Sequence, residues 1–157
     1  MKRFFFDCGT RDSLASGGIF ALRIMIGLMM LIGHGLPKIR NFNAILENDF
    51  PVPDFFPLKL MSPSISLLAT IGAEVGAALL IILGLATRPA AFVLGFTMVV
   101  AAFSVMGNAP WFTGPGVAAA KEPAILFLIP MIAIIMTGAG SISIDAAIYK
   151  DGRRRRW

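Results

Sequence analysis

Three ionisable residues, Arg23, His34 and Glu74, lie inside long apolar stretches of the sequence. Charged groups are costly in such surroundings, so residues of this kind usually mark a site of binding or proton transfer. A carboxylate such as Glu74 pairs with a cation or takes up a proton when it leaves water, and the imidazole of His34 titrates near neutral pH. We therefore expect Glu74, His34 and Arg23 to form a catalytic, proton-exchanging set.

The spacing of these residues predicts how they meet. His34 follows Arg23 by eleven residues, close to three helical turns, so both side chains project to the same side. Glu74 lies near the middle of its own apolar stretch, at a depth that Arg23 can reach. We expect Arg23 and Glu74 to form an ion pair. Such a pair could have a purely structural role and only fix the register of the two helices. Together with His34, it would form a polar track from one membrane face toward the bilayer middle. Lys38 either joins this track or anchors the helix at the membrane surface.

A second polar group lies at the entrance to the last apolar stretch. Lys121 and Glu122 precede this stretch, and Trp111 lies in the loop before it. We expect Lys38, Lys121, Glu122 and Trp111 to bind substrate. Simpler roles stay open, because an acidic residue stabilises a helix N-terminus and a tryptophan is a common anchor at the membrane interface.

Four apolar stretches must position these side chains. They run over about residues 17–36, 65–86, 89–106 and 124–138. A bilayer core of ~30 Å needs about 20 residues in a helix, so the fourth stretch is near the lower limit. Helices are expected because backbone groups in lipid must be satisfied within the segment. We predict an all-α integral membrane protein, a four-helix bundle that forms a single domain over residues 1–157.

Composition supports this class. The chain has 157 residues, of which 57% are hydrophobic and 15% charged, and its mean hydropathy is +0.79. In soluble domains about a quarter of the residues are charged, so this lower proportion excludes a soluble globular protein. A single cysteine, Cys8, and a single histidine exclude an internal disulfide and a cluster of cysteine or histidine metal ligands. We expect no metal, and the sequence contains no flavin, haem or iron–sulfur motif.

The distribution of basic residues predicts the orientation. The two ends of the chain and the short Thr87-Arg88 turn hold nine of the 14 Lys and Arg residues, and the two longer loops hold four. Basic residues favour the cytoplasmic side, so both termini are predicted to be cytoplasmic in a multi-pass protein of the bacterial inner membrane. The basic tail, residues 150–157, then contacts anionic lipid rather than nucleic acid.

Two smaller features predict structure rather than chemistry. Gly72 and Gly76 are four residues apart, a spacing that lets membrane helices approach closely. Asp145, after the last apolar stretch, is expected to bond exposed backbone amides or to pair with Arg88.

The order of several short motifs resembles the DoxX family of small four-span membrane proteins over residues 22–148. The resemblance implies a four-helix bundle in the inner membrane with Arg23, His34, Lys38 and Glu74 as a shared polar set. The family's namesake resembles a subunit of a thiosulfate:quinone oxidoreductase, and other members are linked to quinone resistance, thiol stress or peptide modification. This sequence has Phe103-Ser104-Val105-Met106 where many relatives carry a histidine. The motifs are Leu22-Arg23 with Gly27, Gly33-His34-Gly35-Leu36-Pro37-Lys38, Gly72-Ala73-Glu74-Val75-Gly76, Leu83 to Arg88, Lys121-Glu122, and Thr137 to Gly140 with Ser143-Ile144-Asp145.

Three functions follow as hypotheses. The first is a quinone-associated component of a membrane redox or oxidative-stress system, with quinone as the candidate cofactor. The sequence leaves open whether this component is itself an oxidoreductase. The second is a non-catalytic membrane anchor for a soluble oxidoreductase or maturation enzyme. The third is a small-solute or proton-coupled carrier. The expected partners are the lipid bilayer and a soluble or membrane redox protein, and the oligomeric state stays open.

Overall fold

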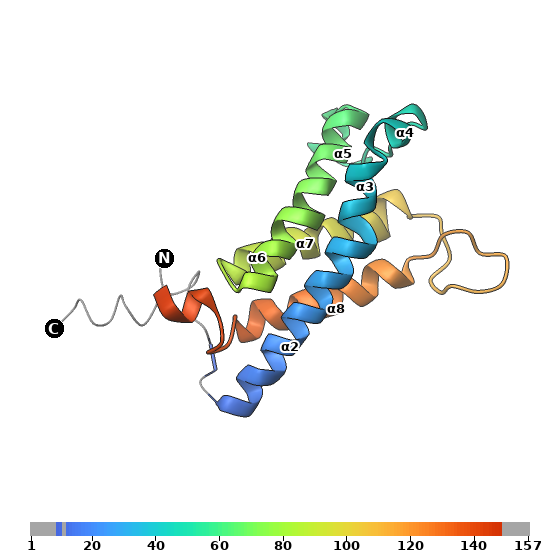
Figure 1. The fold of residues 1–157 in the computed structure, drawn as a ribbon. Coiled ribbons are helices and arrows are strands. Elements are labelled where there is room, and N and C mark those ends of the chain that lie inside the picture. The colour runs from blue at the N-terminus through green and yellow to red at the C-terminus, as the bar shows by residue number, and fades with distance from the viewer. Residues whose placement is uncertain (1–8, 11, 149–157) are drawn as a thin grey trace.

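The computed structural model describes residues 9–10 and 12–148, and helices dominate this part of the chain (Figure 1). Cys8 and the basic tail, residues 150–157, lie outside the described residues. Several α-helices are joined end to end through π-helical turns, which gives four long rods and some short loop helices. The helices are α2 (Ser13–Met30), η1 (Leu31–Gly35), α3 (Leu36–Arg40), α4 (Phe42–Glu47), η2 (Leu58–Leu60), α5 (Pro63–Ile71), η3 (Gly72–Ala77), α6 (Ala78–Leu83), α7 (Thr87–Val100), η4 (Ala101–Val105) and α8 (Glu122–Thr137).

Three of the rods are long and apolar enough to cross a membrane. They are Ser13–Arg40 with 28 residues, Pro63–Leu83 with 21 and Thr87–Val105 with 19. The fourth apolar helix, α8, has 16 residues, which corresponds to about 24 Å at ~1.5 Å per residue. Each rod coincides with one of the predicted apolar stretches, so a multi-helix membrane protein is confirmed. The count of four spans and the side on which the termini lie stay predictions.

Local sequence signals explain where the rods begin and end. The side chain of Asp12 accepts a hydrogen bond of 2.7 Å from the Ala15 N–H and caps α2. Ser62 caps α5 in the same way, and Pro63 follows it at the first helical position. Gly84 ends α6 with a left-handed backbone at φ 68°, a conformation that favours glycine.

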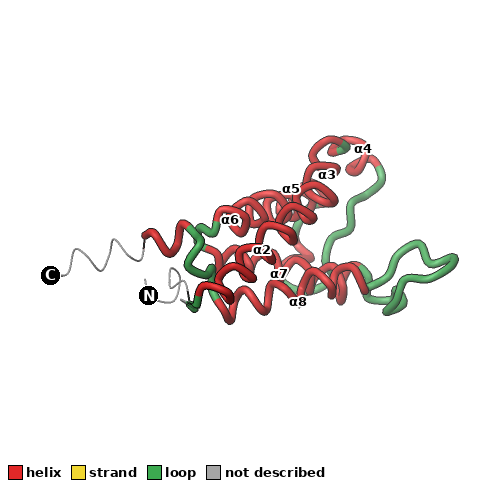
Figure 2. Tube along the Cα trace, turned by 60° about the horizontal axis from the view of Figure 1, so that its bottom comes forward, coloured by secondary structure: helices red, strands yellow, loops and turns green. Residues whose placement is uncertain are grey.

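Small residues let the rods pack closely. Side chains of α6, α7 and α8 form much of the core, and α8 packs along α7 while α2 packs on α6 (Figure 2). A Cβ added to Gly27 would lie 2.5 Å from Ile82 Cγ1, so α2 approaches α6 at this glycine. Gly72 and Gly76 do not form a close helix contact within the chain, because a Cβ at either position meets nothing within 4 Å and both residues are exposed.

The two ends of the bundle differ. At one end, residues 138–148 fold back across the start of α2 and the turn between α6 and α7 (Figure 1). The Ser141 N–H donates to Ser16 Oγ at 3.2 Å, and the Asp145 N–H donates to the Gly84 carbonyl at 2.8 Å. The opposite end holds the loops over residues 41–62 and 106–121 (Figure 2).

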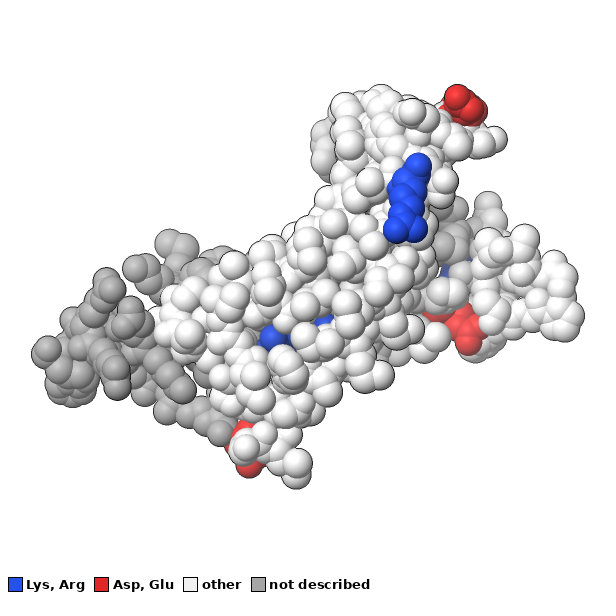
Figure 3. All heavy atoms as spheres, in the orientation of Figure 1, with Lys and Arg blue, Asp and Glu red and all other residues white. Residues whose placement is uncertain are grey.

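The outer surface of the rods is apolar. Met25 on α2 is 65% exposed and Phe92 on α7 is 64% exposed, and the face in Figure 3 shows few charged side chains. Lipid-facing helices have this surface, because hydrocarbon solvates apolar side chains.

Candidate functional site

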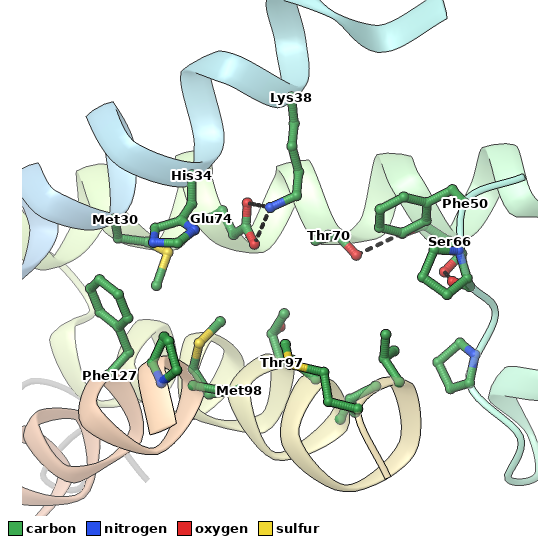
Figure 4. Close-up of a pocket in the computed structure, with 18 residues that line it drawn as sticks. Met30, His34, Lys38, Phe50, Ser66, Thr70, Glu74, Thr97, Met98 and Phe127 are labelled. Atoms are coloured by element: carbon green, nitrogen blue, oxygen red, sulfur yellow. Dashed lines mark hydrogen bonds and ion pairs between the residues drawn. The ribbon is translucent and has the colours of Figure 1, made fainter. Parts of the chain in front are cut away.

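A pocket of about 260 Å³ lies between the rods near the end that carries the two long loops. It is enclosed by η1 and α3 on one side, α5 and η3 on a second, α7 and η4 on a third, and the start of α8 (Figure 4). Residues of the first loop close it. The lining residues are mostly apolar, with polar groups at His34, Lys38, Ser66, Thr70, Glu74 and Thr97.

An ion pair between Lys38 and Glu74 is the main charged feature of this pocket. Lys38 Nζ lies 2.7 Å from Glu74 Oε1 and 2.5 Å from Oε2. The Glu74 side chain is 6% exposed and the Lys38 side chain 22% exposed. Because an isolated carboxylate is costly to bury, Lys38 provides the compensating charge.

His34 lies in the same pocket as this pair. Its half-buried ring packs edge-on against Phe127 of α8, with ring centroids 5.2 Å apart (Figure 4). The structure therefore brings together His34, Lys38 and Glu74, three of the predicted site residues.

π-helical turns shape this site. His34 lies in η1, Glu74 lies in η3, and Ala101 and Val105 of η4 line the opposite wall. A π-turn accommodates an extra residue in a helix, changes the direction of the side chains that follow, and is frequent at functional sites. The turn in η1 also precedes Pro37, which has no N–H and whose ring would crowd the carbonyl four residues earlier in a regular helix. The rod consequently continues through Pro37 to Lys38.

Arg23 does not pair with Glu74, and this expectation is corrected. In the antiparallel packing of the first two rods, Gly35 is level with Glu74 and Val75, whereas Arg23 is level with α6 near Ile82. Eight residues separate Glu74 from Ile82, about 12 Å along a helix. A depth in the membrane that is estimated for each residue from its own helix alone misses this shift between the two rods.

The guanidinium of Arg23 instead bonds backbone carbonyls at the far end of the bundle. Arg23 is 1% exposed. Nε donates to Ile81 O at 2.9 Å, Nη2 to Ile82 O at 3.3 Å, and Nη1 to Ile142 O at 3.1 Å and to Ala139 O. These bonds satisfy carbonyls at the end of α6 and tie residues 139–142 to the first rod.

Asp145 lies beside this cluster. Its carboxylate accepts from the Ala86 N–H at 2.8 Å and the Thr87 N–H at 2.9 Å, which caps the start of α7. The predicted bond between Asp145 and backbone amides is confirmed, and together with Arg23 it fixes the end of the bundle opposite the pocket.

A family model described as DoxX matches residues 18–107. The chain belongs to the DoxX family. The match covers the first long rod from residue 18 onward, all of the second and third, and the residues His34, Lys38 and Glu74, and it ends before α8. Searches of curated proteins and of solved structures find no match.

The remaining predicted residues of this DoxX protein organise the loop beside the pocket. Lys121 Nζ donates to the Gly107 carbonyl at 2.8 Å and lies 5.0 Å from the centroid of the Trp111 ring. The Glu122 carboxylate accepts from the hydroxyl of Thr113 at 2.6 Å and from its N–H at 2.8 Å. The hydroxyl bond, followed by the N–H bond, lowers the pKa of Glu122. Lys121, Glu122 and Trp111 are not among the residues that line the pocket.

Other lining residues of the DoxX pocket were not predicted. Met30 and Met98 contribute side chains from two rods, and Phe50, Pro51 and Pro53 come from the first loop. Two bonds hold this loop in place: Ser66 Oγ donates to Pro51 O at 2.9 Å, and the Asp54 N–H donates to Ser104 Oγ at 3.0 Å. Hydroxyl residues inside apolar helices were the available sequence signal for this contact.

Proposed function

We propose that this DoxX protein binds a quinone beside His34, Lys38 and Glu74 and acts as a quinone-associated component of a membrane redox or oxidative-stress system in the bacterial inner membrane. The observation that carries the proposal is the composition of the pocket. Its walls are apolar, and its charge is confined to one neutralised pair with an imidazole nearby. Ligand sites typically combine apolar walls with a few convergent polar groups.

A quinone ring matches this arrangement. It is flat and apolar, and its carbonyl oxygens accept hydrogen bonds. The Lys38 ammonium has three N–H donors, of which two face the Glu74 oxygens, so one remains for a carbonyl oxygen of the ligand. A neutral His34 provides one further donor.

Reduction of a quinone to a quinol takes two electrons and two protons. Glu74 and His34 are suited to exchange protons with the ligand because both are ionisable and both line the pocket. The electrons come from a partner protein or from a reducing substrate such as thiosulfate. We therefore assign binding and proton exchange to this chain, and electron supply to its partner.

Solvent extraction of the purified protein tests the proposal. Quinone is quantified by absorbance and mass in the wild type, in Glu74→Gln and in His34→Ala, with Lys59→Gln as a control at an exposed loop lysine. The expected result is near-stoichiometric quinone in the wild type and the control, with loss in both pocket variants. A folded wild type that is empty and does not take up added quinone would overturn the proposal and favour the membrane anchor.

The carrier hypothesis has less support. It needs charged groups at the bilayer middle that are available to a solute, and the Arg23 guanidinium is engaged by four backbone carbonyls. Flux of a solute into liposomes that contain the pure protein would restore that alternative.

A further inference from the structure

A second cavity of about 240 Å³ adjoins the pocket. It lies between α5 with the start of η3 and α7, and it extends to the first loop at Leu58 and Met61. The two cavities have five lining residues in common, which are Pro53, Ser66, Thr70, Thr97 and Val100. We call the second cavity the α5–α7 groove.

The α5–α7 groove lies on the lipid side of the bundle. Phe92, Val93 and Phe96, which form part of its wall on α7, are 64%, 47% and 45% exposed. Ala69 on α5 is exposed as well. The pocket, by contrast, reaches the buried Glu74 and Met30. The groove therefore lies between the exposed surface of the rods and the pocket that holds the ion pair.

The polar residues of the groove are satisfied within the protein. Thr70 Oγ1 donates to Ser66 O at 2.9 Å, Thr97 Oγ1 donates to Val93 O at 3.0 Å, and Ser66 Oγ donates to Pro51 O. The hydroxyl donors are consequently engaged, and the remaining wall is hydrocarbon and aromatic. Such a wall accommodates an alkyl or prenyl chain and offers little to a polar solute.

Thr70 and Thr97 mark the junction of the two cavities, and Figure 4 shows them on opposite walls, beyond Glu74 when viewed from His34. From Ser66 to Ala73 the groove follows α5 and the start of η3 over a rise of seven residues, about 10 Å along the helix.

We propose that the ligand of this protein is a quinone with an apolar tail, whose ring occupies the pocket and whose tail passes between Thr70 and Thr97 into the α5–α7 groove. The inference rests on the proposed function and adds the class of quinone and its lateral entry from the bilayer between α5 and α7.

Filling the groove separates tail binding from ring binding. Ala69→Phe places a ring in the groove at an exposed position, and Leu68→Phe is the matched control, because the neighbouring Leu68 is 57% exposed and does not line either cavity. The probes are a methyl naphthoquinone and the same ring with a decyl chain, and their Kd values are measured by equilibrium dialysis against protein in nanodiscs.

The expected result is that Ala69→Phe weakens binding of the decyl quinone by about tenfold or more. Binding of the methyl quinone to this variant should not change, and Leu68→Phe should not change binding of either probe. Failure of the folded wild type to bind either probe would overturn the proposed function itself. Binding of both probes with no effect of Ala69→Phe on the decyl compound, or with an equal effect on both, would overturn only the tail site.

Photo-crosslinking tests the tail site in the wild-type protein, without any substitution that could affect folding. A quinone with a diazirine at the end of its tail should label the α7 peptide around Phe92 and Phe96 or the α5 peptide around Ala69. Labelling spread evenly over the lipid-facing helices would contradict the proposed path.

Discussion

Lys38 and Glu74 form a two-pronged ion pair that joins the first rod to the second, with 2.7 Å and 2.5 Å between Lys38 Nζ and the two carboxylate oxygens. The pair lies in the pocket wall rather than in the packed core, and Lys38 is the more exposed partner. This unequal burial has a consequence for stability, because the two residues lose different amounts of solvation when their partner is removed.

Lys38→Met is expected to destabilise the protein more than Glu74→Gln. It leaves a nearly buried carboxylate without a cation, at a cost of about 3–5 kcal/mol. Glu74→Gln leaves an ammonium that is 22% exposed and that water can solvate in part. The double variant should recover much of the loss of Lys38→Met. Thermal unfolding of the four proteins in detergent gives the coupling energy.

The exposed Lys59 is the control for the loss of a positive charge, and Lys59→Met should leave the unfolding temperature nearly unchanged. Equal destabilisation by Lys38→Met and Glu74→Gln, with no recovery in the double variant, would contradict a coupled pair.

Gly35→Ala should loosen the site, whereas Gly33→Ala should not. A Cβ at Gly35 would lie 2.6 Å from Val75 Cγ2 and 3.2 Å from the Glu74 carbonyl oxygen, and a Cβ at Gly33 meets nothing within 4 Å. Overpacking at Gly35 is expected to cost about 1–3 kcal/mol and to weaken quinone binding, because it pushes η1 away from η3. Alanine at position 33 should be neutral or slightly stabilising. Thermal unfolding and quinone titration of both variants test this prediction. Equal stability and equal quinone affinity of the two variants would contradict the close approach at Gly35.

The helices could be predicted from the sequence because apolar stretches of this length have few alternatives. Residues 65–86 were expected to form a rod, and the helix runs over Pro63–Leu83. His34, Lys38 and Glu74 could be found for a related reason, since ionisable groups in apolar helices are conspicuous.

The partner of Glu74 could not be predicted in the same way. It depends on how far one rod is shifted along the other and on the π-turns in η1 and η3, which alter the direction of His34, Lys38 and Glu74. A prediction from the regular helical period of 3.6 residues takes neither effect into account. The first-loop contribution to the pocket was not predicted either, because a hydroxyl residue in an apolar helix, such as Ser66, does not by itself identify its partner, which here is the Pro51 carbonyl.

Arg23→Met should reduce the yield of folded protein while leaving the ligand affinity of the surviving protein unchanged. The substitution removes the donors to carbonyls of α6 and of residues 139–142, and hydrogen bonds from a charged group contribute about 1.5–3 kcal/mol each. Arg23→Lys keeps the charge but cannot reach all four acceptors, so an intermediate yield is expected. Size-exclusion chromatography gives the folded fraction, and quinone titration gives the Kd. A raised Kd in well-folded Arg23→Lys protein would instead return Arg23 to the binding site.

Acidification should loosen the loop that holds Trp111 at its contact with Glu122. Bonds from Thr113 lower the pKa of Glu122, which precedes the apolar stretch 124–138. A carboxyl whose pKa is lowered on folding stabilises the loop above its unfolded pKa, and this contribution is lost as pH falls through the folded value. Trp111, which packs on Lys121 next to Glu122, should report the change by fluorescence in a Trp157→Phe background. Thr113→Val, which removes the hydroxyl donor, should move the transition to higher pH, whereas Ser64→Ala, at an exposed position on α5, should not. A transition at the same pH with and without the Thr113 hydroxyl would show that Glu122 does not control this loop.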